Sequence, residues 1–103
     1  MSEKKKPTYD LESFQEKCAA DLNATFVALR DAAALGFDEE DIVAVVQTMR
    51  RVHFYKSMTS YGDAKIWQDV YHVPSDAGLL YVKFTSDTIS EFLLLSFKEK
   101  DNG

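Results

Sequence analysis

The spacing of hydrophobic residues changes near the middle of the chain, from the period of a helix to that of a strand. In the first half, apolar residues recur every three or four positions, which is typical of helices with one buried face. Glycine often ends such helices, because it adopts the left-handed conformation easily. The pattern predicts a first helix over about 11–22, a second that ends at Gly36, and a third between Asp38 and Arg51.

A run of acidic residues opens the third predicted helix: Asp38, Glu39, Glu40 and Asp41. Negative side chains favour the first turn of a helix, because unpaired N–H groups and a partial positive charge lie there. A helix start therefore explains this run more simply than a metal site does.

Beyond Arg51 the chain is rich in β-branched and aromatic residues and is interrupted by turn-forming residues. This pattern predicts strands over about 52–58, 66–73, 79–85 and 92–98, with a turn at Pro74–Gly78. Three helices followed by four strands, with no helix between the strands, indicate an α+β fold. We expect N-terminal helices packed on one face of an antiparallel sheet of about four strands.

Alternation within the last two predicted strands separates a core face from an outer face. Two sets of apolar residues are expected in the core: Leu80, Val82 and Phe84, and Leu93, Leu95 and Phe97. Their polar neighbours Tyr81, Lys83 and Lys98 are then expected to point away from the helices.

Length and composition fit one domain of 103 residues, which we expect to span 10–100. Residues 1–9 are polar and lysine-rich, so a disordered leader is expected there. Cys18 is the only cysteine, which excludes an intrachain disulfide and suits a reducing compartment. No apolar run approaches the ~20 residues of a membrane span, and no apolar core follows the basic start. We therefore expect a cytoplasmic protein without membrane contact.

The charge balance is acidic, with 17 Asp and Glu against 12 Lys and Arg and a formal net charge of −5. Proteins that bind nucleic acid usually carry a basic excess. Long-range attraction to RNA should therefore be weak, although a local basic pocket is compatible with this balance.

Candidate chemistry gathers in the second half of the chain. The sequence has no metal-ligand spacing and no glycine-rich phosphate loop. The predicted strands and turns carry the following polar groups: His53, Lys56, Gln68, His72, Tyr81, Lys83 and Lys98. Lysine and tyrosine suit phosphodiester cleavage, which needs cations around a charged pentacoordinate phosphate and groups that move protons. From residue types alone, surface lysines on an exposed sheet face remain the simpler interpretation.

Four strings of the sequence are specific enough to suggest a family: FYKSMTSY over 54–61, IWQDVY over 66–71, LYVK over 80–83 and SFKEK over 96–100. They closely resemble the MqsR family, the ribonuclease toxins of type II toxin–antitoxin pairs, whose fold is similar to that of the RelE toxins. The resemblance implies an mRNA endoribonuclease (an mRNA interferase) that works by 2′-hydroxyl attack without a metal or other cofactor. It also implies a cognate antitoxin as partner.

Carried over by position, the resemblance places the active-site residues at Lys56, Gln68, Tyr81 and Lys98. By their chemistry, Lys56 and Lys98 would stabilise the pentacoordinate phosphate. Tyr81 would carry a proton or stack on a base, and Gln68 would position the phosphate or the ribose hydroxyl.

Further candidates for RNA binding are Tyr55, Tyr61, His72 and Lys83. Tyr55 and Tyr61 are suited to stacking on bases. His72 stands where the family commonly has Arg, and the following loop is one residue longer than in the family. A permanent cation is thereby replaced by one that titrates near neutral pH.

Three interpretations of function follow. The first is an active mRNA endonuclease toxin, with or without the ribosome to present its substrate. The second is a weak or inactive homologue that binds an antitoxin or a regulator; the acidic charge and the loss of Arg favour it. The third, a metal-dependent hydrolase, is disfavoured by the missing ligand spacing.

Overall fold

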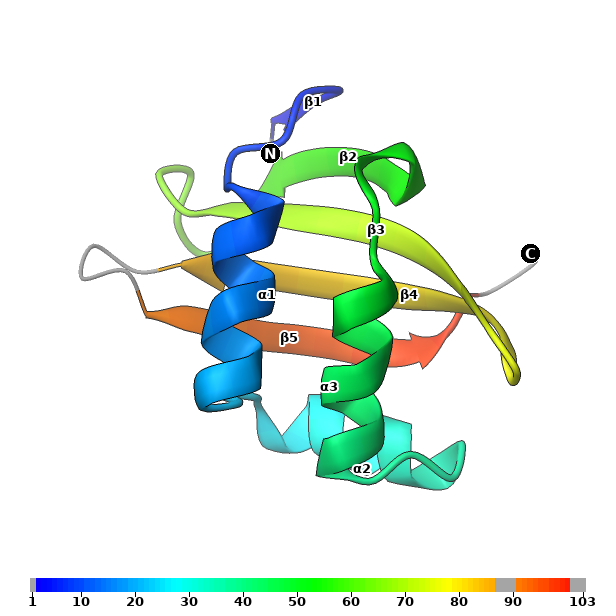
Figure 1. Ribbon diagram of the computed structural model, residues 1–103. Helices are drawn as coiled ribbons and strands as arrows, with labels where there is room; N and C mark the ends of the chain where they lie inside the picture. The colour runs from blue at the N-terminus through cyan, green and yellow to red at the C-terminus, as the bar shows by residue number, and fades with distance from the viewer. Residues whose placement is uncertain (1, 87–90, 101–103) are drawn as a thin grey trace.

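The computed structural model describes residues 2–86 and 91–100 and has the expected α+β architecture (Figure 1). Within these residues, three α-helices and one 3-10 turn accompany a five-stranded antiparallel sheet. The elements in chain order are β1 (Glu3–Lys4), α1 (Leu11–Ala20), α2 (Phe26–Ala34), α3 (Glu39–Thr48), η1 (Arg51–His53), β2 (Phe54–Thr59), β3 (Trp67–Ser75), β4 (Gly78–Ser86) and β5 (Phe92–Glu99). None of the helices in this described part is long and apolar enough to cross a membrane.

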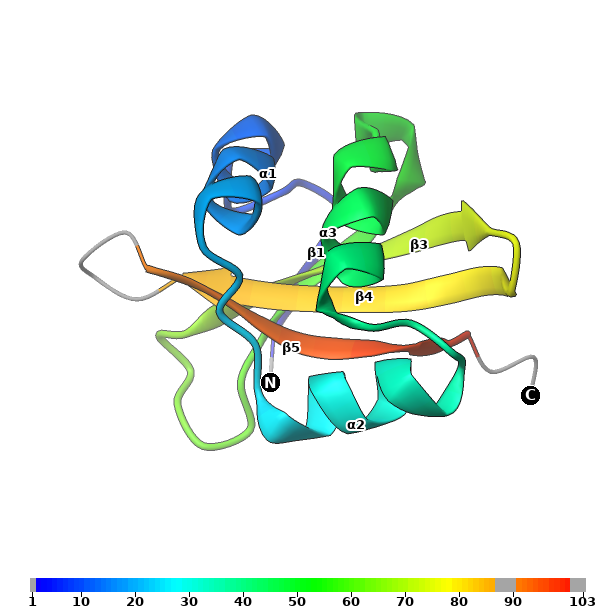
Figure 2. The same cartoon turned by 60° about the horizontal axis from the view of Figure 1, so that its bottom comes forward.

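The sheet follows the order β1-β2-β3-β4-β5, and each strand is antiparallel to its neighbours. Helices α1 and α3 pack on one face of this sheet, and α2 lies beside the edge strand β5 (Figure 2). The backbone fixes α2 there: the N–H of Thr25 donates to the carbonyl of Leu94 at 3.0 Å, and the N–H of Leu94 donates to Asn23 at 2.9 Å. In the described part of the chain, no helix covers the other face of the sheet.

Each helix begins at a residue whose side chain accepts a hydrogen bond from the first turn: Asp10, Thr25 and Asp38. Asp38 and Asp41 form a reciprocal capping box, with bonds of 2.9 and 3.0 Å. The acidic run is therefore a helix start, as expected. Gly36 follows α2 with a φ of 89° and ends it as predicted.

The third helix ends earlier than predicted. It was expected to reach Arg51, but α3 ends at Thr48 because Met49 has an extended backbone, with φ −63° and ψ 141°. Arg51 belongs instead to the short turn η1, which leads into β2. The side chain of Arg51 lies over the ring of Phe54, 4.9 Å from its centroid.

The second predicted strand is longer than expected. A turn was predicted over Pro74–Gly78, yet β3 runs through Pro74 to Ser75 and pairs with β4 up to Gly78. Proline removes one backbone donor and fits where a strand has a free side. The pairing of β2 with β3 ends opposite Tyr71, so Pro74 lies where β4 is its paired neighbour.

The core lies between the helices and the inner face of the sheet. The ring of Phe14 from α1 stacks on Phe84 of β4 with centroids 3.7 Å apart. Burying a side chain of this size contributes about 1.5–3 kcal/mol. Cys18 also lies in this core, and burial raises the pKa of its thiol to about 11.

A β-bulge changes the face of part of β5. Lys83 pairs with Ser96, whereas Phe84 pairs with Leu94, so Leu95 is an extra residue on β5. Leu94 is consequently fully buried, whereas Leu93 and Leu95, which were expected in the core, are only partly buried. The predicted burial of Leu80, Val82 and Phe84 on β4 and of Phe97 on β5 is confirmed.

The N-terminal residues differ from the expected disordered leader. Glu3 and Lys4 form β1, which pairs with β2, and the N–H groups of Thr8 and Tyr9 donate to the carboxylate of Asp69 at 2.9–3.1 Å. A sheet edge carries unpaired backbone groups, and a buried carboxylate needs donors. The N-terminal segment satisfies both, and the sheet therefore has five strands rather than about four.

Candidate active site on the open face of the sheet

Side chains of β3 alternate between the core and the face of the sheet that no described helix covers. Tyr71 and Val73 belong to the core, so Gln68 and His72 point to the opposite side. We call this side the open face; the polar residues that it carries are Lys56, Gln68, His72, Tyr81, Lys83, Ser96 and Lys98. The predicted catalytic residues therefore share one surface.

One row of side chains crosses the open face from strand to strand. Tyr81 of β4 is paired with His72 of β3 on one side and with Lys98 of β5 on the other. The rings of His72 and Tyr81 have centroids 6.1 Å apart, and the ammonium of Lys98 lies 5.4 Å from the Tyr81 centroid. On β2, Tyr55 stacks on His72 at 4.3 Å. Tyr81 thus lies between an imidazole and a cation.

Lys56 lies in the next row, on β2 opposite Val70. Its ammonium donates a hydrogen bond to the carboxylate of Glu3, with Nζ and Oε1 2.5 Å apart. This bond raises the pKa of Lys56 against the opposing effect of partial burial. The Lys56 side chain is 20% exposed, so it is a cation that is partly shielded from solvent. Sequence reasoning missed Glu3, because the chain around it was expected to be disordered.

Tyr81 is half-buried, and burial raises the pKa of its hydroxyl, while the nearby charge of Lys56 opposes this shift. The phenol is therefore neutral at physiological pH and can donate a hydrogen bond or a proton. Lys83 lies two residues further along β4. Burial, and secondly the charge of Lys98, lower the pKa of its amine.

Gln68 is on the open face but at its far end. It pairs with Met58, four residues along β3 from His72, whereas Lys98 is two strands away from β3. With a rise of ~3.3 Å per residue and ~4.8 Å between strands, the Cα atoms of Gln68 and Lys98 are about 16 Å apart. By the same spacings, the Cα atoms of Lys56 and Lys98, which lie three strands and two residues apart, are also about 16 Å from each other. The open face therefore carries Lys56 and Gln68 on one side of Tyr81 and Lys98 on the other.

Two residues that the sequence singled out lie outside this set of four. Tyr61 belongs to the loop between β2 and β3, and its side chain is 95% exposed. His53 belongs to η1, where its Nδ1 accepts a hydrogen bond from the backbone N–H of Arg50 at 3.0 Å. Burial, and then the charge of Arg50, lower the pKa of His53.

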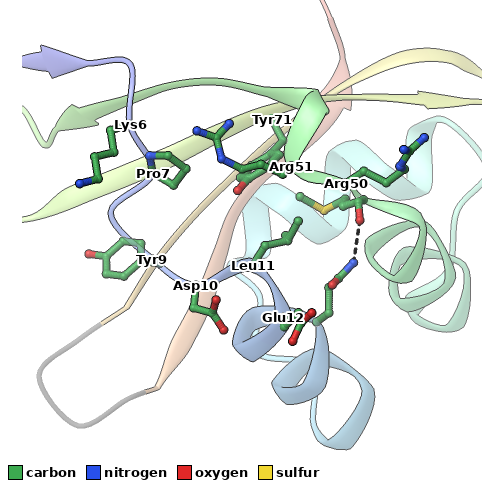
Figure 3. A pocket seen from close by; sticks show the side chains of 11 residues that line it. Lys6, Pro7, Tyr9, Asp10, Leu11, Glu12, Arg50, Arg51 and Tyr71 are labelled. Carbon is green, nitrogen blue, oxygen red and sulfur yellow. Dashed lines mark hydrogen bonds between the residues drawn. The ribbon is translucent and has the colours of Figure 1, made fainter.

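A cavity of about 570 Å³ opens on the helix side, between the N-terminal segment, α1 and Arg50–Arg51 (Figure 3). Its lining includes Tyr71 of β3, whose buried hydroxyl has no hydrogen-bond partner among the described residues. Burial raises the pKa of Tyr71 to about 12. None of the predicted catalytic residues lines this cavity, so it is not the site that the sequence pointed to.

Residues 2–86 and 91–100 contain no group of three or more His, Cys, Asp or Glu side chains that could hold a metal ion. The groups gathered on the open face are instead amines, phenols, an amide and an imidazole. Such groups can bind a phosphodiester and move protons around it.

Comparison with known proteins agrees with the geometry. A family model described as "Motility quorum-sensing regulator, toxin of MqsA" matches residues 6–99. The chain is also similar to the mRNA interferase toxin MqsR of Escherichia coli (strain K12). The two are 42% identical over 82 residues, which cover 80% of this chain and 82% of that protein. The resemblance found in the four sequence strings is thereby confirmed, and the chain belongs to the motility quorum-sensing regulator family, the toxins of MqsA.

Proposed function

We propose that this toxin is an endoribonuclease that cleaves mRNA at the open face of the sheet, through attack of a ribose 2′-hydroxyl on the adjacent phosphate. The observation that carries the proposal is the pairing that places Tyr81 between His72 and Lys98, with the cation of Lys56 in the neighbouring row. The name of the E. coli relative, an mRNA interferase, supports the choice of substrate.

The reaction forms a bond from the 2′-oxygen to phosphorus and breaks the bond to the 5′-oxygen, which leaves a cyclic phosphate and a 5′-hydroxyl. Negative charge builds on the phosphate oxygens at the pentacoordinate stage. Lys98, which lies over Tyr81, supplies positive charge there. Lys56, whose pKa is raised by its bond to Glu3, adds positive charge from the neighbouring row. A raised pKa makes Lys56 an electrostatic group and not a proton acceptor.

Two neutral groups in the row would move the protons. Tyr81, with its raised pKa, donates to the departing 5′-oxygen. His72 lies next to it, and burial, then the charge of Lys100, lower the pKa of His72 below its ordinary value of 6.5. Its imidazole is therefore neutral near pH 7 and accepts the proton of the 2′-hydroxyl. The ring centroids of the two groups are 6.1 Å apart, a separation that allows both to reach one phosphate.

Other residues would hold the RNA. Gln68, which lies on β3 next to the strand of Lys56, suits a phosphate or a ribose hydroxyl. Tyr55 stacks within the row, Lys83 adds a half-buried amine beside it, and Tyr61 reaches out from the adjacent loop. These amines lie together on one face and form a local basic surface, although the net charge of the whole chain is −5.

The cellular setting follows the family. We propose a cytoplasmic toxin that a cognate antitoxin neutralises, and that meets mRNA free or on the ribosome. Expression without an antitoxin should then arrest growth, and Lys56→Ala should relieve the arrest.

The direct test is cleavage of a long RNA of mixed sequence by the purified protein in excess chelator. Wild type should give discrete fragments with 5′-hydroxyl ends, and both Lys56→Ala and Lys98→Ala should lose them. Lys17→Ala, which removes a lysine from α1 on the helix side, is the matched control and should cleave like wild type. A signal that disappears in chelator would contradict the metal-free mechanism.

A second candidate is a non-catalytic module that binds the antitoxin or a regulator. The acidic net charge and the carboxylate of Glu3 on Lys56 favour it. Folded wild-type protein that cleaves neither free RNA nor mRNA on translating ribosomes would establish this alternative.

A further inference from the structure

The aromatic row on the open face continues into the N-terminal segment. The ammonium of Lys5, the residue after β1, lies over the ring of Tyr55 at 4.9 Å from its centroid. Tyr55 stacks on His72, His72 lies against Tyr81, and Lys98 lies over Tyr81. Three rings from β2, β3 and β4 are therefore flanked by a lysine at each end.

Lys5 is held in place from both sides along the chain. Before it, Glu3 and Lys4 pair with Met58 and Ser57 of β2. After it, the N–H groups of Thr8 and Tyr9 donate to the buried carboxylate of Asp69. The ammonium is thus a fixed part of the face rather than the end of a free tail.

We propose that the row Lys5–Tyr55–His72–Tyr81–Lys98 is a binding track for single-stranded RNA, which crosses the strands of the sheet, with Lys5 as an additional phosphate-binding residue. This inference rests on the proposed function and extends it beyond the reacting phosphate. From β1 to β5 the track spans about 19 Å, which is four strand spacings. That length accommodates several nucleotides.

Chemistry selects unpaired RNA as the occupant. Aromatic side chains stack on exposed bases of any sequence, and amines follow the phosphates. The bases of a duplex are already stacked and do not reach such rings. The whole chain, the lysines of the row included, has a formal net charge of −5, so nonspecific attraction elsewhere on the surface is weak. Affinity should therefore depend strongly on the few cations of the row.

The first test measures the charge at the Lys5 end. The probe is a short fluorescent RNA, 2′-O-methylated throughout so that it cannot be cleaved, and the readout is anisotropy at several salt concentrations. Lys5→Gln should weaken binding severalfold and reduce the salt slope by about one. Lys6→Gln is the matched control, with the same change one residue away; Lys6 lines the cavity on the helix side. Equal effects of the two substitutions would overturn the track.

The second test measures stacking. Tyr55→Leu should weaken binding about tenfold, whereas Tyr55→Phe, which keeps the ring, should bind like wild type. Probes with one abasic position should lose affinity for wild type at one or more positions. When the abasic position is the one that Tyr55 contacts, the affinity of Tyr55→Leu for that probe should not fall further. Fully additive losses at every position would show that Tyr55 stacks on no base and would overturn the inference.

The failure of this inference differs from the failure of the proposed function. If wild type binds and cleaves RNA while Lys5→Gln and Tyr55→Leu bind the probe unchanged, only the track is wrong. If binding shows the expected dependence on Lys5 and Tyr55 but no RNA is cleaved, the track stands and the catalytic proposal falls. Wild type that neither binds the probe nor cleaves RNA refutes both. Thermal unfolding like that of wild type establishes that the variants are folded.

Discussion

The carboxylate of Glu3 and the ammonium of Lys56 meet across β1 and β2, with 2.5 Å between Oε1 and Nζ. The two residues are 53 positions apart in the sequence, and one of them is the lysine proposed to stabilise the reacting phosphate. The bond to Glu3 raises the pKa of Lys56, and the carboxylate lies where the proposed site needs a phosphate oxygen. In the proposed complex, RNA must therefore replace one anion by another at Lys56.

Replacing Glu3 by glutamine should therefore strengthen RNA binding. The carboxylate is exposed, and exposed ion pairs are weak, so we expect a gain of roughly two- to fivefold in affinity for the 2′-O-methylated RNA. Glu12→Gln makes the same charge change in the first turn of α1, on the helix side, and should leave the affinity nearly unchanged. An equal gain in both variants would assign the effect to net charge alone.

Tyr81→Phe separates proton transfer from stacking. The substitution removes the hydroxyl and keeps the ring that lies against His72 and Lys98. Loss of a general acid should slow single-turnover cleavage by about 10²- to 10⁴-fold, while affinity for the RNA stays within twofold. Tyr81→Leu should lose both cleavage and affinity for the RNA. Cleavage by Tyr81→Phe at the wild-type rate would show that the phenol acts by stacking alone.

The pH dependence should differ between binding and cleavage. The pKa of His72 is lowered, by burial first and by Lys100 second, so the imidazole is neutral at pH 7 and gains its charge only below 6.5. Tyr55 on β2 and Tyr81 on β4 are its aromatic neighbours. As the pH falls through that range, affinity for RNA should rise, because the row gains a cation. Cleavage should fall, because the proton acceptor is lost.

His72→Gln should remove both changes between pH 5 and 7, and His72→Arg should bind RNA strongly at every pH yet cleave slowly. Anisotropy with the 2′-O-methylated RNA and single-turnover cleavage, measured over the same pH series, provide the comparison. A cleavage profile of His72→Gln that matches wild type would remove His72 from the mechanism.

The sequence predicted the fold class, the order of the three helices and of strands β2 to β5, and the outward position of Tyr81 and Lys83, because these follow from local periodicity and caps. It did not predict the bulge at Leu95. An extra residue in β5 moves Leu94 into the core while Lys98 stays opposite Tyr81, and both outcomes depend on pairing with β4. Alternation within one strand contains no information about such a shift.

The order of the N-terminal segment could not be predicted from the sequence, for a different reason. A polar segment such as Glu3–Lys6 has no hydrophobic pattern, so composition alone predicts disorder. Its order comes from distant partners: the unpaired edge of β2 and the carboxylate of Asp69. Even the family resemblance, which lies in the second half, did not include Glu3 or Lys5. The sequence thus pointed to those residues of the candidate site that lie within the predicted strands. It missed Glu3 and Lys5, which reach the site from the N-terminal segment.

Asp69→Asn tests whether this anchor maintains the N-terminal side of the site. The carboxylate is fully buried and accepts hydrogen bonds from Thr8 at 3.0 and 3.1 Å and from Tyr9 at 2.9 Å. An amide can accept at one atom only, which leaves donors unpaired, so we expect a loss of about 2–4 kcal/mol in the free energy of unfolding by urea.

Asp63→Asn changes a carboxylate in the loop before β3, where it accepts a bond from Lys65, and should cost less than about 0.5 kcal/mol. In Asp69→Asn the residues around Lys5 should also exchange their amide hydrogens faster, and RNA affinity should fall as in Lys5→Gln. An Asp69→Asn protein that is destabilised but binds RNA like wild type would show that the anchor contributes to stability and not to the RNA site.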